Sequence, residues 1–321
     1  MRLLVTGGAG YIGSVVAAQL LATGNDVTVL DDLSTGHADA IPAGAHFVEA
    51  DVRSAGEVLR DGYDGVLHFA AKSLVGESVQ LPARYWDNNL GGTLALLDAM
   101  RRHDCRRLVF SSTAAVYGEP ETSPIEEDAP ARPTNPYGAS KLAVDTAIGE
   151  YARWGEIGAA SLRYFNVAGA SEQPGGWLGE RHDPETHLIP LVLRVALGQR
   201  ESVQIFGQDY PTPDGTCVRD YIHVEDLARA HLLALEATRT GEHAIYNLGN
   251  GNGFSVREVV DVAREVTGHT IPAEEAFRRA GDPAVLVASS KRVRDALGWT
   301  PEKPSLTSMT ADAWEFARRA D

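Results

Sequence analysis

Short apolar runs alternate with longer stretches of helical periodicity through the first half of the chain. The apolar runs predict six β-strands, at residues 3–6, 27–30, 46–49, 65–69, 107–111 and 159–163. The stretches between them predict helices at residues 12–23, 83–103 and 137–154, with Gly24 ending the first. Strands that alternate with helices are typical of a parallel sheet covered on both faces. We therefore expect an α/β fold with a Rossmann-like, doubly wound parallel sheet.

Beyond Asn166 this alternation breaks up, because glycine and proline become frequent. Helices are predicted at residues 188–197, 224–237 and 255–267, and a loop at residues 207–219. We expect a dinucleotide-binding domain over residues 1–166 and a smaller α/β substrate-binding domain over residues 167–321. The boundary is approximate, and segments of the two domains are expected to interleave.

The charge of the chain argues against one class of partner. A formal net charge of −15 leaves no basic excess to neutralise a nucleic acid backbone, so we expect no nucleic acid partner. A small anionic ligand is compatible with this charge, because single arginines and helix N-termini hold phosphate locally.

Cysteine content and hydropathy bear on the compartment. The two cysteines, Cys105 and Cys217, are too few and too far apart for a disulfide framework or a thiolate metal site. No apolar run approaches the roughly 18 residues that a membrane span needs. The first residues enter a predicted strand at once, so we expect no signal peptide, no membrane partner and a cytoplasmic location.

A glycine-rich turn follows the first predicted strand. Gly7, Gly10 and Gly13 are spaced three residues apart between that strand and the first predicted helix. Glycine at these positions permits a tight turn, close approach of the backbone to a pyrophosphate, and packing of helix on sheet. The free N–H groups at the helix start would then face the anion. The turn predicts a dinucleotide site.

Acidic residues follow the second and third predicted strands. Asp31 stands 18 residues beyond Gly13, where a carboxylate can accept hydrogen bonds from the adenosine ribose. It would repel a 2′-phosphate, so the expected cofactor is NAD and not NADP. The alternative is that Asp31 and Asp32 only begin a polar turn. Asp51 and Val52 are expected beside the adenine.

A hydroxyl-rich strand end and a Tyr-Lys pair predict the chemistry. Ser111, Ser112 and Thr113 end the fifth predicted strand, and Tyr137 and Lys141 follow Pro136 at a spacing that puts both on one helix face. A phenol is a poor base at pH 7. The Lys141 ammonium and an oxidised nicotinamide, at roughly 6 Å, would each lower the pKa of Tyr137 by about two units. Thr113 would hydrogen-bond the same substrate oxygen.

These motifs resemble the extended short-chain dehydrogenases/reductases across nearly the whole chain, and within them the UDP-hexose 4-epimerases. The matching segments of the first half are residues 7–13, 51–52, 68–71, 75–78, 88–89, 111–118, 137–141 and 163–166. Those of the second half are residues 205–207, 209–212, 214–216, 218–224 and 246–249. The resemblance implies an NAD-dependent isomerase of galactose metabolism that epimerises C4′ of UDP-glucose and UDP-galactose through a transient 4-keto sugar.

The resemblance also implies a role for each matching residue. Tyr137 is the base, Lys141 its electrostatic partner, and Thr113 takes the place usually held by serine. The implied NAD ligands are Gly7, Gly10, Tyr11, Ile12, Gly13, Asp31, Asp32, Asp51, Val52, Phe69, Ala70, Ala71, Lys72, Asn89, Ser111, Tyr137, Lys141, Tyr164 and Phe165. The implied substrate ligands are Thr113, Asn166, His187, Leu188, Arg219, Arg279 and Asp282. An arginine suits pyrophosphate because its planar fork pairs two oxygens.

Three positions depart from the family pattern. Ala71-Lys72-Ser73 replaces the usual Gly-Leu-Lys, which moves the lysine by one residue and puts its NAD contact in question. His187 stands where asparagine is common, so a uridine or sugar contact differs. Leu286 occupies the position whose bulk governs entry of N-acetylated sugars, and an intermediate side chain there leaves the substrate range open.

Several other functions are compatible with these motifs. The chain could epimerise UDP-N-acetylglucosamine, UDP-glucuronate or UDP-xylose. A nucleotide-sugar 4,6-dehydratase is disfavoured, because Ala114 and Ala115 follow Thr113 where such enzymes carry an acidic residue. A non-catalytic NAD-sensing protein would have no need for the Thr-Tyr-Lys set.

The histidines and the long helices bear on metal binding and on oligomeric state. His68 and His223 are expected to pack locally, and no metal site is predicted. The resemblance implies a homodimer formed by the helices at residues 83–103 and 137–154.

Overall fold

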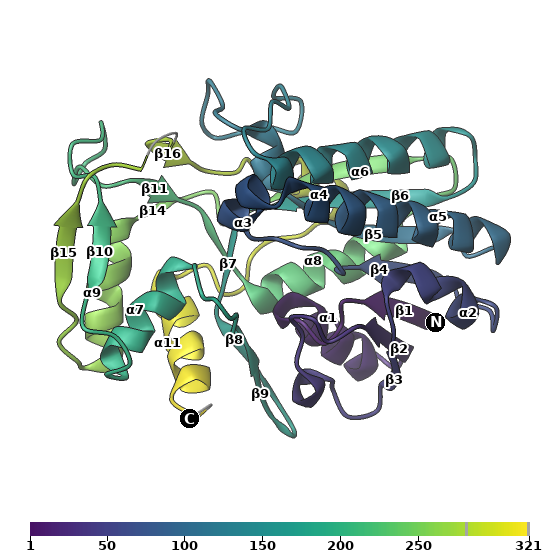
Figure 1. Cartoon of the computed structure of the whole chain (residues 1–321), viewed down its shortest axis with the longest axis horizontal. Coiled ribbons are helices and arrows are strands. Elements are labelled where there is room, and N and C mark those ends of the chain that lie inside the picture. The colour runs from purple at the N-terminus through teal and green to yellow at the C-terminus, as the bar shows by residue number, and fades with distance from the viewer. Residues whose placement is uncertain (280–281, 320–321) are drawn as a thin grey trace.

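A seven-stranded parallel sheet forms the centre of the computed structural model, which describes residues 1–279 and 282–319 (Figure 1). The strand order is β3-β2-β1-β4-β5-β6-β13, and every neighbouring pair is parallel. The strands are β1 (Arg2–Thr6), β2 (Asp26–Asp31), β3 (His46–Glu49), β4 (Gly65–His68), β5 (Arg107–Thr113), β6 (Gly158–Tyr164) and β13 (His243–Leu248). The predicted Rossmann-like fold and its six strands are confirmed, to within two residues at each strand end.

The seventh strand corrects the sequence analysis, which predicted only six. β13 lies in the second half of the chain and pairs with β6 along its whole length, from His243 opposite Ala159 to Leu248 opposite Tyr164. Its sequence mixes polar and apolar residues because it lies at the sheet edge, where its first three residues are only partly buried. The central sheet therefore draws strands from both halves of the chain.

Helices cover both faces of the sheet. The strand pleat sends Leu3 and Val5 into one apolar cluster and Leu4 into another. The first cluster includes α1 (Tyr11–Ala22) and α8 (Val224–Ala237), and the second includes α2 (Ala55–Leu59), α5 (Gly92–Arg102) and α6 (Pro136–Arg153). In Figure 1, α5 and α6 run along the upper side of this layer and α1 along the lower side. The predicted helix at residues 224–237 thus packs on the sheet of the first half.

The predicted helix at residues 83–103 is interrupted. After α3 (Val75–Gln80), the chain forms α4 (Pro82–Tyr85), a π-helical stretch over Trp86–Gly91, and then α5. Gly91 and Gly92 follow one another at this junction, and a Cβ at Gly92 would lie 2.8 Å from Val52 Cγ1. Periodicity alone predicts one continuous helix here, and it is wrong about the backbone because a π-helical stretch leaves no distinct sequence pattern.

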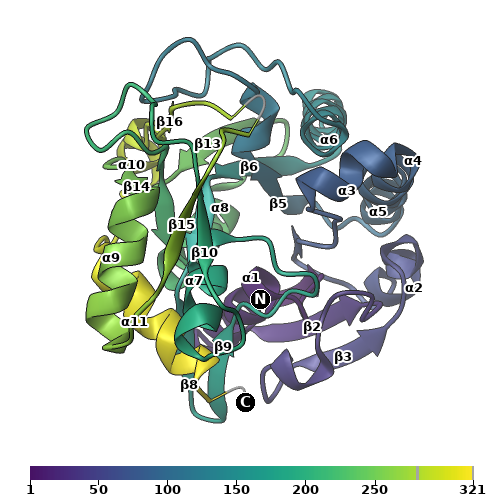
Figure 2. The same ribbon diagram turned by 60° about the vertical axis from the view of Figure 1, so that its left-hand side comes forward.

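Short elements make up the second half, and Figure 2 shows β10 and β15 running side by side in front of the sheet. The strands are β7 (Asn166–Ala168), β8 (Ala170–Gln173), β9 (Gly176–Gly179), β10 (Val203–Phe206), β11 (Val218–Arg219), β12 (Tyr221–His223), β14 (Phe254–Ser255), β15 (Ala273–Ala276) and β16 (Val285–Leu286). The helices are α7 (Leu188–Ala196), α9 (Val256–Thr267), α10 (Lys291–Leu297) and α11 (Leu306–Ala317). The predictions for α7, α8 and α9 are confirmed, whereas α10 and α11 were not predicted. Among the described residues, no helix combines the length and apolarity of a transmembrane segment.

Candidate active site

The glycine turn at the end of β1 is closed by backbone contacts that only glycine allows. Gly7 has a φ of +72°, and a Cβ on it would lie 2.5 Å from the Ala70 nitrogen. A Cβ on Gly13 would lie 2.2 Å from the Gly7 oxygen. Gly10 precedes α1 and offers no capping side chain, and the first turn of α1 holds no acidic residue. The N–H groups at this helix start suit the diphosphate of a dinucleotide.

Tyr11 and Ile12 begin α1 directly after this turn. The Tyr11 hydroxyl donates a 2.6 Å hydrogen bond to the Gly169 oxygen, so its side chain ties the turn to the second half of the chain. Ile12 is partly buried against the cluster beneath the sheet. Both residues therefore offer a cofactor their backbone more readily than their side chains.

Asp31 fastens the glycine turn to the end of β2. Its carboxylate accepts hydrogen bonds from the Ala9 nitrogen at 3.0 Å and the Leu33 nitrogen at 2.9 Å. Burial raises the pKa of Asp31, and the two hydrogen bonds partly offset this rise. Asp32 accepts from the Ser34 nitrogen at 2.9 Å. The carboxylates thus order a polar turn, as the alternative interpretation expected, and the same turn lies against the glycine loop.

Lys72 reaches this turn in spite of its shifted position in the sequence. Its Nζ donates to Ser34 Oγ at 3.0 Å, and its backbone N–H donates to Asn89 Oδ1 at 2.8 Å. Asn89, in the π-helical stretch, also donates to the Lys72 oxygen at 3.0 Å and to Ser140 Oγ at 3.0 Å. The buried Asn89 side chain therefore holds the loop after β4 against the start of α6.

The remaining cofactor candidates line the same edge of the sheet. Phe69 packs on His231 with ring centroids 4.8 Å apart, and Ala70 is the residue that excludes a side chain at Gly7. Ala71 continues this loop and is partly buried. Asp51 caps a short turn through the Arg53 nitrogen at 2.8 Å, and Val52 is buried beneath α5.

The end of β5 and the start of α6 form one cluster, which we call the β5–α6 corner: Ser111, Thr113, Tyr137 and Lys141. Pro136 opens α6, and Asn135 caps it by accepting from the Gly138 nitrogen at 2.9 Å. Lys141 Nζ donates to the Ser111 oxygen at 2.7 Å, and Thr113 shares a hydrogen bond with Tyr137. The structure therefore brings the three predicted catalytic side chains to one place.

Neighbouring aromatic residues enclose the corner. The Lys141 ammonium lies 4.7 Å from the centroid of the Phe110 ring, and the Tyr85 ring meets the Tyr137 ring edge-on at 6.4 Å. Tyr164 hydrogen-bonds Ser111 Oγ, and Phe165 packs on the buried Val116-Tyr117-Ile125 cluster. These contacts fix the ends of β5 and β6 beside α6.

Burial dominates the electrostatics of the β5–α6 corner. Burial raises the pKa of Tyr137, and the Thr113 hydrogen bond opposes this rise. Burial also lowers the pKa of Lys141 to about 7, although Asp145 acts in the opposite direction. The protein alone therefore does not make the phenol acidic. The expected lowering requires the positive charge of oxidised nicotinamide in addition to Lys141.

Asp145 is a residue that the sequence analysis missed. Its Oδ2 accepts from Ser112 Oγ at 3.1 Å and pairs with the buried Arg163 guanidinium at 2.9 Å. It stands four residues after Lys141 on the same face of α6. That spacing was the signal that could have identified it as the counter-charge beneath the lysine.

The predicted substrate residues lie on short strands and loops and at the start of α7. Arg219 forms an ion pair with Asp282, which we call the Arg219 pair, and it also donates to the Val218 oxygen at 2.8 Å. Asn166 Nδ2 donates to the Asp220 oxygen at 3.0 Å. The Arg279 guanidinium lies 3.9 Å from the centroid of the Phe206 ring.

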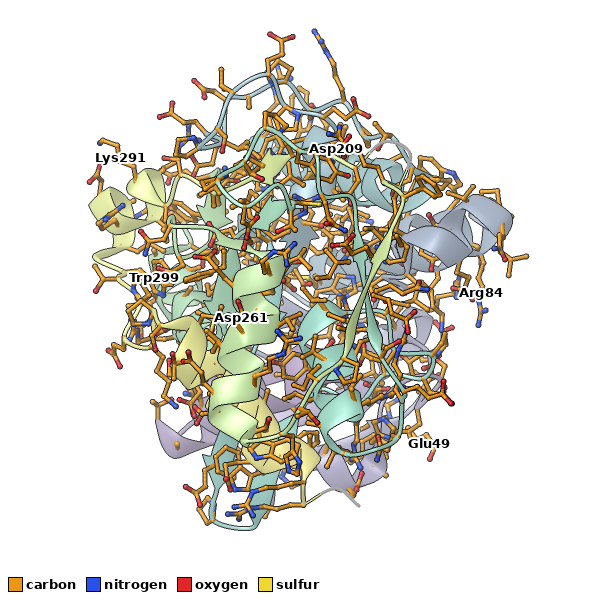
Figure 3. The ribbon with its side chains drawn as sticks, turned by 90° about the vertical axis from the view of Figure 1, so that its left-hand side faces the viewer. Glu49, Arg84, Asp209, Asp261, Lys291 and Trp299 are labelled. Carbon is orange, nitrogen blue, oxygen red and sulfur yellow. The ribbon has the colours of Figure 1, made fainter. Side chains whose placement is uncertain are left out.

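Two further side chains border this region. Leu286 stands opposite Arg219 in the β11–β16 pairing and packs on the Val116-Tyr117-Ile125 cluster. Asp209, labelled in the upper part of the molecule in Figure 3, pairs with Arg278 at 2.6 Å. Leu286 is thus placed within reach of whatever Arg219 binds.

His187 and Leu188 begin α7. His187 Nδ1 lies 2.5 Å from Glu180 Oε1 and 3.3 Å from Glu185 Oε1. Burial acts to lower the pKa of His187, but the two carboxylates raise it to about 10. The Nδ1 atom of His187 therefore interacts with both carboxylates. Leu188 is the first residue of α7.

His68 and His223 pack locally, as predicted. His68 bonds Thr6 Oγ1 at 2.6 Å and Thr93 Oγ1 at 2.9 Å, which links β1, β4 and α5. His223 bonds Asp312 at 3.0 Å and accepts from the Glu225 nitrogen at 3.1 Å.

Comparison with known proteins agrees with this arrangement. The sequence model of the NAD dependent epimerase/dehydratase family matches residues 3–249. The UDP-glucose 4-epimerase of Streptomyces lividans is 61% identical and that of Corynebacterium glutamicum 59% identical, each alignment covering 98% of this chain and 95% of the relative. The crystal structure of UDP-glucose 4-epimerase from Brucella ovis in complex with NAD superposes with a TM-score of 0.92 at 43% identity, over 98% of this chain and 97% of that one. The chain therefore belongs to the NAD-dependent epimerase/dehydratase family and, within it, to the UDP-glucose 4-epimerases.

Proposed function

We propose that this chain interconverts UDP-glucose and UDP-galactose by inverting C4′ of the sugar, in galactose metabolism. The observation that carries this proposal is the β5–α6 corner, where Tyr137, Thr113 and Lys141 converge at the carboxyl edge of a dinucleotide-binding sheet. Relatives that are 59–61% identical over nearly the whole chain carry the name of this activity.

The residues around the glycine turn fit the diphosphate of NAD. Contacts of 2.5 Å and 2.2 Å for added Cβ atoms at Gly7 and Gly13 show that this turn has no room for side chains, which leaves its backbone N–H groups open to an anion. We assign the ribose contact to Asp31 or Asp32, with Lys72 beside them. Bound NAD supplies a hydride acceptor and donor, so that C4′ can be oxidised to the 4-keto stage and reduced again.

Tyr137 is the proposed base, which takes the proton of the 4′-hydroxyl and later returns it. Thr113 orients the same substrate oxygen through its hydroxyl, which already hydrogen-bonds Tyr137. The Lys141 ammonium, held by the Ser111 oxygen, stabilises the phenolate that forms. Each residue acts on one proton transfer, and the set has no acid for expelling water from the sugar.

The second half holds the nucleotide in this proposal. Arg219 and Arg279 take the diphosphate charge, with Asn166 and Asp282 completing the contacts and His187 and Leu188 bordering the site. An anchored diphosphate and a loosely held sugar together allow the 4-keto sugar to turn over. Hydride can then return to either face of C4′.

The direct test uses the purified chain loaded with NAD. It is incubated with UDP-galactose, UDP-N-acetylgalactosamine and UDP-glucuronate in separate samples, and the products are resolved by chromatography and NMR. UDP-glucose should form fastest, from UDP-galactose. A keto-deoxy sugar would indicate a 4,6-dehydratase, and no turnover by an NAD-loaded sample would indicate an NAD-sensing protein. Either result contradicts the proposal, as does a preference for one of the other two sugars.

We propose in addition that the chain is a cytoplasmic homodimer. Large apolar side chains are exposed on the elements that precede and form α5, with Val79 63%, Leu81 50%, Trp86 41% and Leu94 40% exposed. Burying them against a second copy would remove this apolar surface from water. Leu94→Asp should therefore yield monomers in sedimentation, whereas Phe47→Asp, equally exposed but on β3, should leave the dimer intact.

A further inference from the structure

Four metal-binding side chains converge in the segment that joins β9 to α7. Glu180, His182, Glu185 and His187 each direct one ligand atom to a common point, and these atoms all lie within 4.8 Å of one another. The four residues fall within eight positions of the sequence, in the order Glu-x-His-x-x-Glu-x-His. None of them belongs to the β5–α6 corner or to the Arg219 pair.

The spacing of the ligand atoms matches a small divalent ion. His182 Nδ1 lies 2.9 Å from Glu180 Oε1 and 3.9 Å from Glu185 Oε2, while His187 Nδ1 lies 2.5 Å and 3.3 Å from oxygens of the same two carboxylates. Tetrahedral zinc with bonds of 2.0–2.2 Å places its ligands about 3.4 Å apart. The observed separations bracket this value, so a slight opening of the cluster accommodates the ion.

Glu185 supplies an independent indication that the cluster binds a cation. Its side chain is fully buried. Its Oε1 accepts from the backbone nitrogens of Thr186 at 2.7 Å and His187 at 2.8 Å, but its Oε2 is buried without a hydrogen-bond partner. A buried, unpartnered carboxylate oxygen is costly. Here it lies 3.9 Å from His182 Nδ1, where a cation bound by the cluster would satisfy it.

One divalent ion would also balance the charge of the two carboxylates. Within the described residues, histidines are the only cationic groups that lie within 4.0 Å of the Glu180 and Glu185 carboxylates. Two carboxylates carry two negative charges, which one divalent ion and two neutral imidazoles would balance. Two imidazole nitrogens and two carboxylate oxygens suit zinc better than calcium or magnesium, which prefer oxygen ligands alone.

We propose that Glu180, His182, Glu185 and His187 bind one zinc ion in a closed, four-ligand structural site. Such a site leaves no open position for a substrate, so the ion acts on the fold and not on the reaction. Arg181, between the first two ligands, pairs with Asp39, and its oxygen contacts His37. The ion therefore fixes residues 180–187, and through Arg181 it also holds the loop after β2.

The test uses the full-length, NAD-bound, tag-free chain and zinc alone as the probe. Elemental analysis of protein grown with added zinc should give one zinc per chain. After dialysis against a chelator, titration with Co²⁺ should produce the intense visible bands of tetrahedral cobalt, and added zinc should abolish them. Zinc should also raise the midpoint of thermal unfolding of the chelator-treated protein.

Two variants and one control identify the ligands. His182→Ala removes a ligand, and Glu185→Gln removes the charge while keeping an oxygen for the Thr186 and His187 nitrogens. Each should weaken zinc binding by at least about tenfold, since even outer-shell partners of metal sites commonly contribute 10–100-fold to affinity. His46→Ala, a histidine on β3 with a side chain 75% exposed, should bind zinc like the wild type.

A wild-type chain that retains no zinc and gives no tetrahedral cobalt spectrum overturns the proposal. So do His182→Ala and Glu185→Gln proteins that keep their NAD and bind zinc as tightly as the wild type. Because these measurements do not use turnover, they stand apart from the test of epimerisation.

Discussion

The β5–α6 corner and the Arg219 pair are built in opposite ways. The corner rests on a seven-residue strand and an 18-residue helix, and its Lys141 side chain is buried and hydrogen-bonded to a backbone carbonyl. Arg219 and the neighbouring Leu286 lie on two-residue strands, and the partner Asp282 lies outside the strands, just before β16. Arg279 also lies outside the strands and is exposed.

Under the proposed function, this difference separates the residues of the chemical step from those that bind the nucleotide. Proton transfer tolerates little displacement of the reacting groups, so it is placed where regular backbone fixes every side chain. Nucleotide binding relies on charged side chains of loops, which already pair with one another and can exchange those partners for phosphate. Substitutions in the corner should therefore reduce kcat, and substitutions in the Arg219 pair should raise KM.

Tyr137→Phe is expected to have the largest effect. Removing the phenolic oxygen removes the proposed base, and general base catalysis commonly contributes about 10²–10⁴-fold to the rate. kcat for UDP-galactose should fall by that factor with bound NAD and KM nearly unchanged, as measured by product formation. Tyr151→Phe, farther along α6, is the matched control. A Tyr137→Phe enzyme with near-normal kcat would remove the corner from the mechanism.

Lys141→Met should reduce kcat by about 10²-fold, because a charge at roughly 6 Å contributes on the order of 2–3 kcal/mol. It should also change the pH profile. The pKa of Lys141 lies near 7, so its ammonium is present below pH 7 and is lost as the pH rises through that value. Its assistance to Tyr137 therefore fades on the alkaline side in the wild type. In the wild type, kcat should therefore fall as the pH rises through about 7, and this fall should be absent from Lys141→Met. If Lys141→Met shows the same fall, another group causes it.

Arg219→Met tests the other side of the comparison. Loss of a charge-assisted hydrogen bond of about 1.5–3 kcal/mol should raise KM for UDP-galactose by roughly 10–100-fold. kcat should change much less, because the corner is untouched. Initial rates over a range of UDP-galactose concentrations separate the two constants, with Arg60→Met as an exposed control. A fall in kcat at constant KM would place Arg219 in the chemistry.

Leu286→Ala is expected to have the smallest effect and concerns sugar size. Shortening this side chain opens space beside Arg219, and differences of this size in an apolar pocket change selectivity by about tenfold or more. The ratio of kcat/KM for UDP-N-acetylgalactosamine to that for UDP-galactose should rise. A ratio equal to that of the wild type would mean that Leu286 does not border the sugar.

Much of the fold was predictable because its strands are buried parallel strands, which appear as uninterrupted apolar runs. β13 was missed because its sheet-edge sequence, which includes His243 and Asn247, lacks such a run. The π-helical stretch at Trp86–Gly91 was missed because its composition is that of an ordinary helix. Both features depend on tertiary packing, which a local pattern does not contain.

The site was predictable where one short segment carries several members of it. The glycine turn and the Tyr137-Lys141 pair are each contained within seven residues. The sequence identified Arg219 and Asp282 separately but not their pairing, which joins residues distant in the chain. It also assigned His187 to the substrate alone, although Glu180 and Glu185 stand close enough in the sequence to have indicated a shared cluster.

The pairing of β13 with β6 has a consequence for how the polypeptide is made. The sheet face under α8 stays uncovered until residue 237 has been synthesised, and β6 remains an open strand edge until residue 248. A nascent chain that ends near residue 166 is therefore an aggregation-prone intermediate. Its folding is completed only by segments far downstream in the sequence. Synthesis of the C-terminal half thus acts as the step that protects the N-terminal half from aggregation.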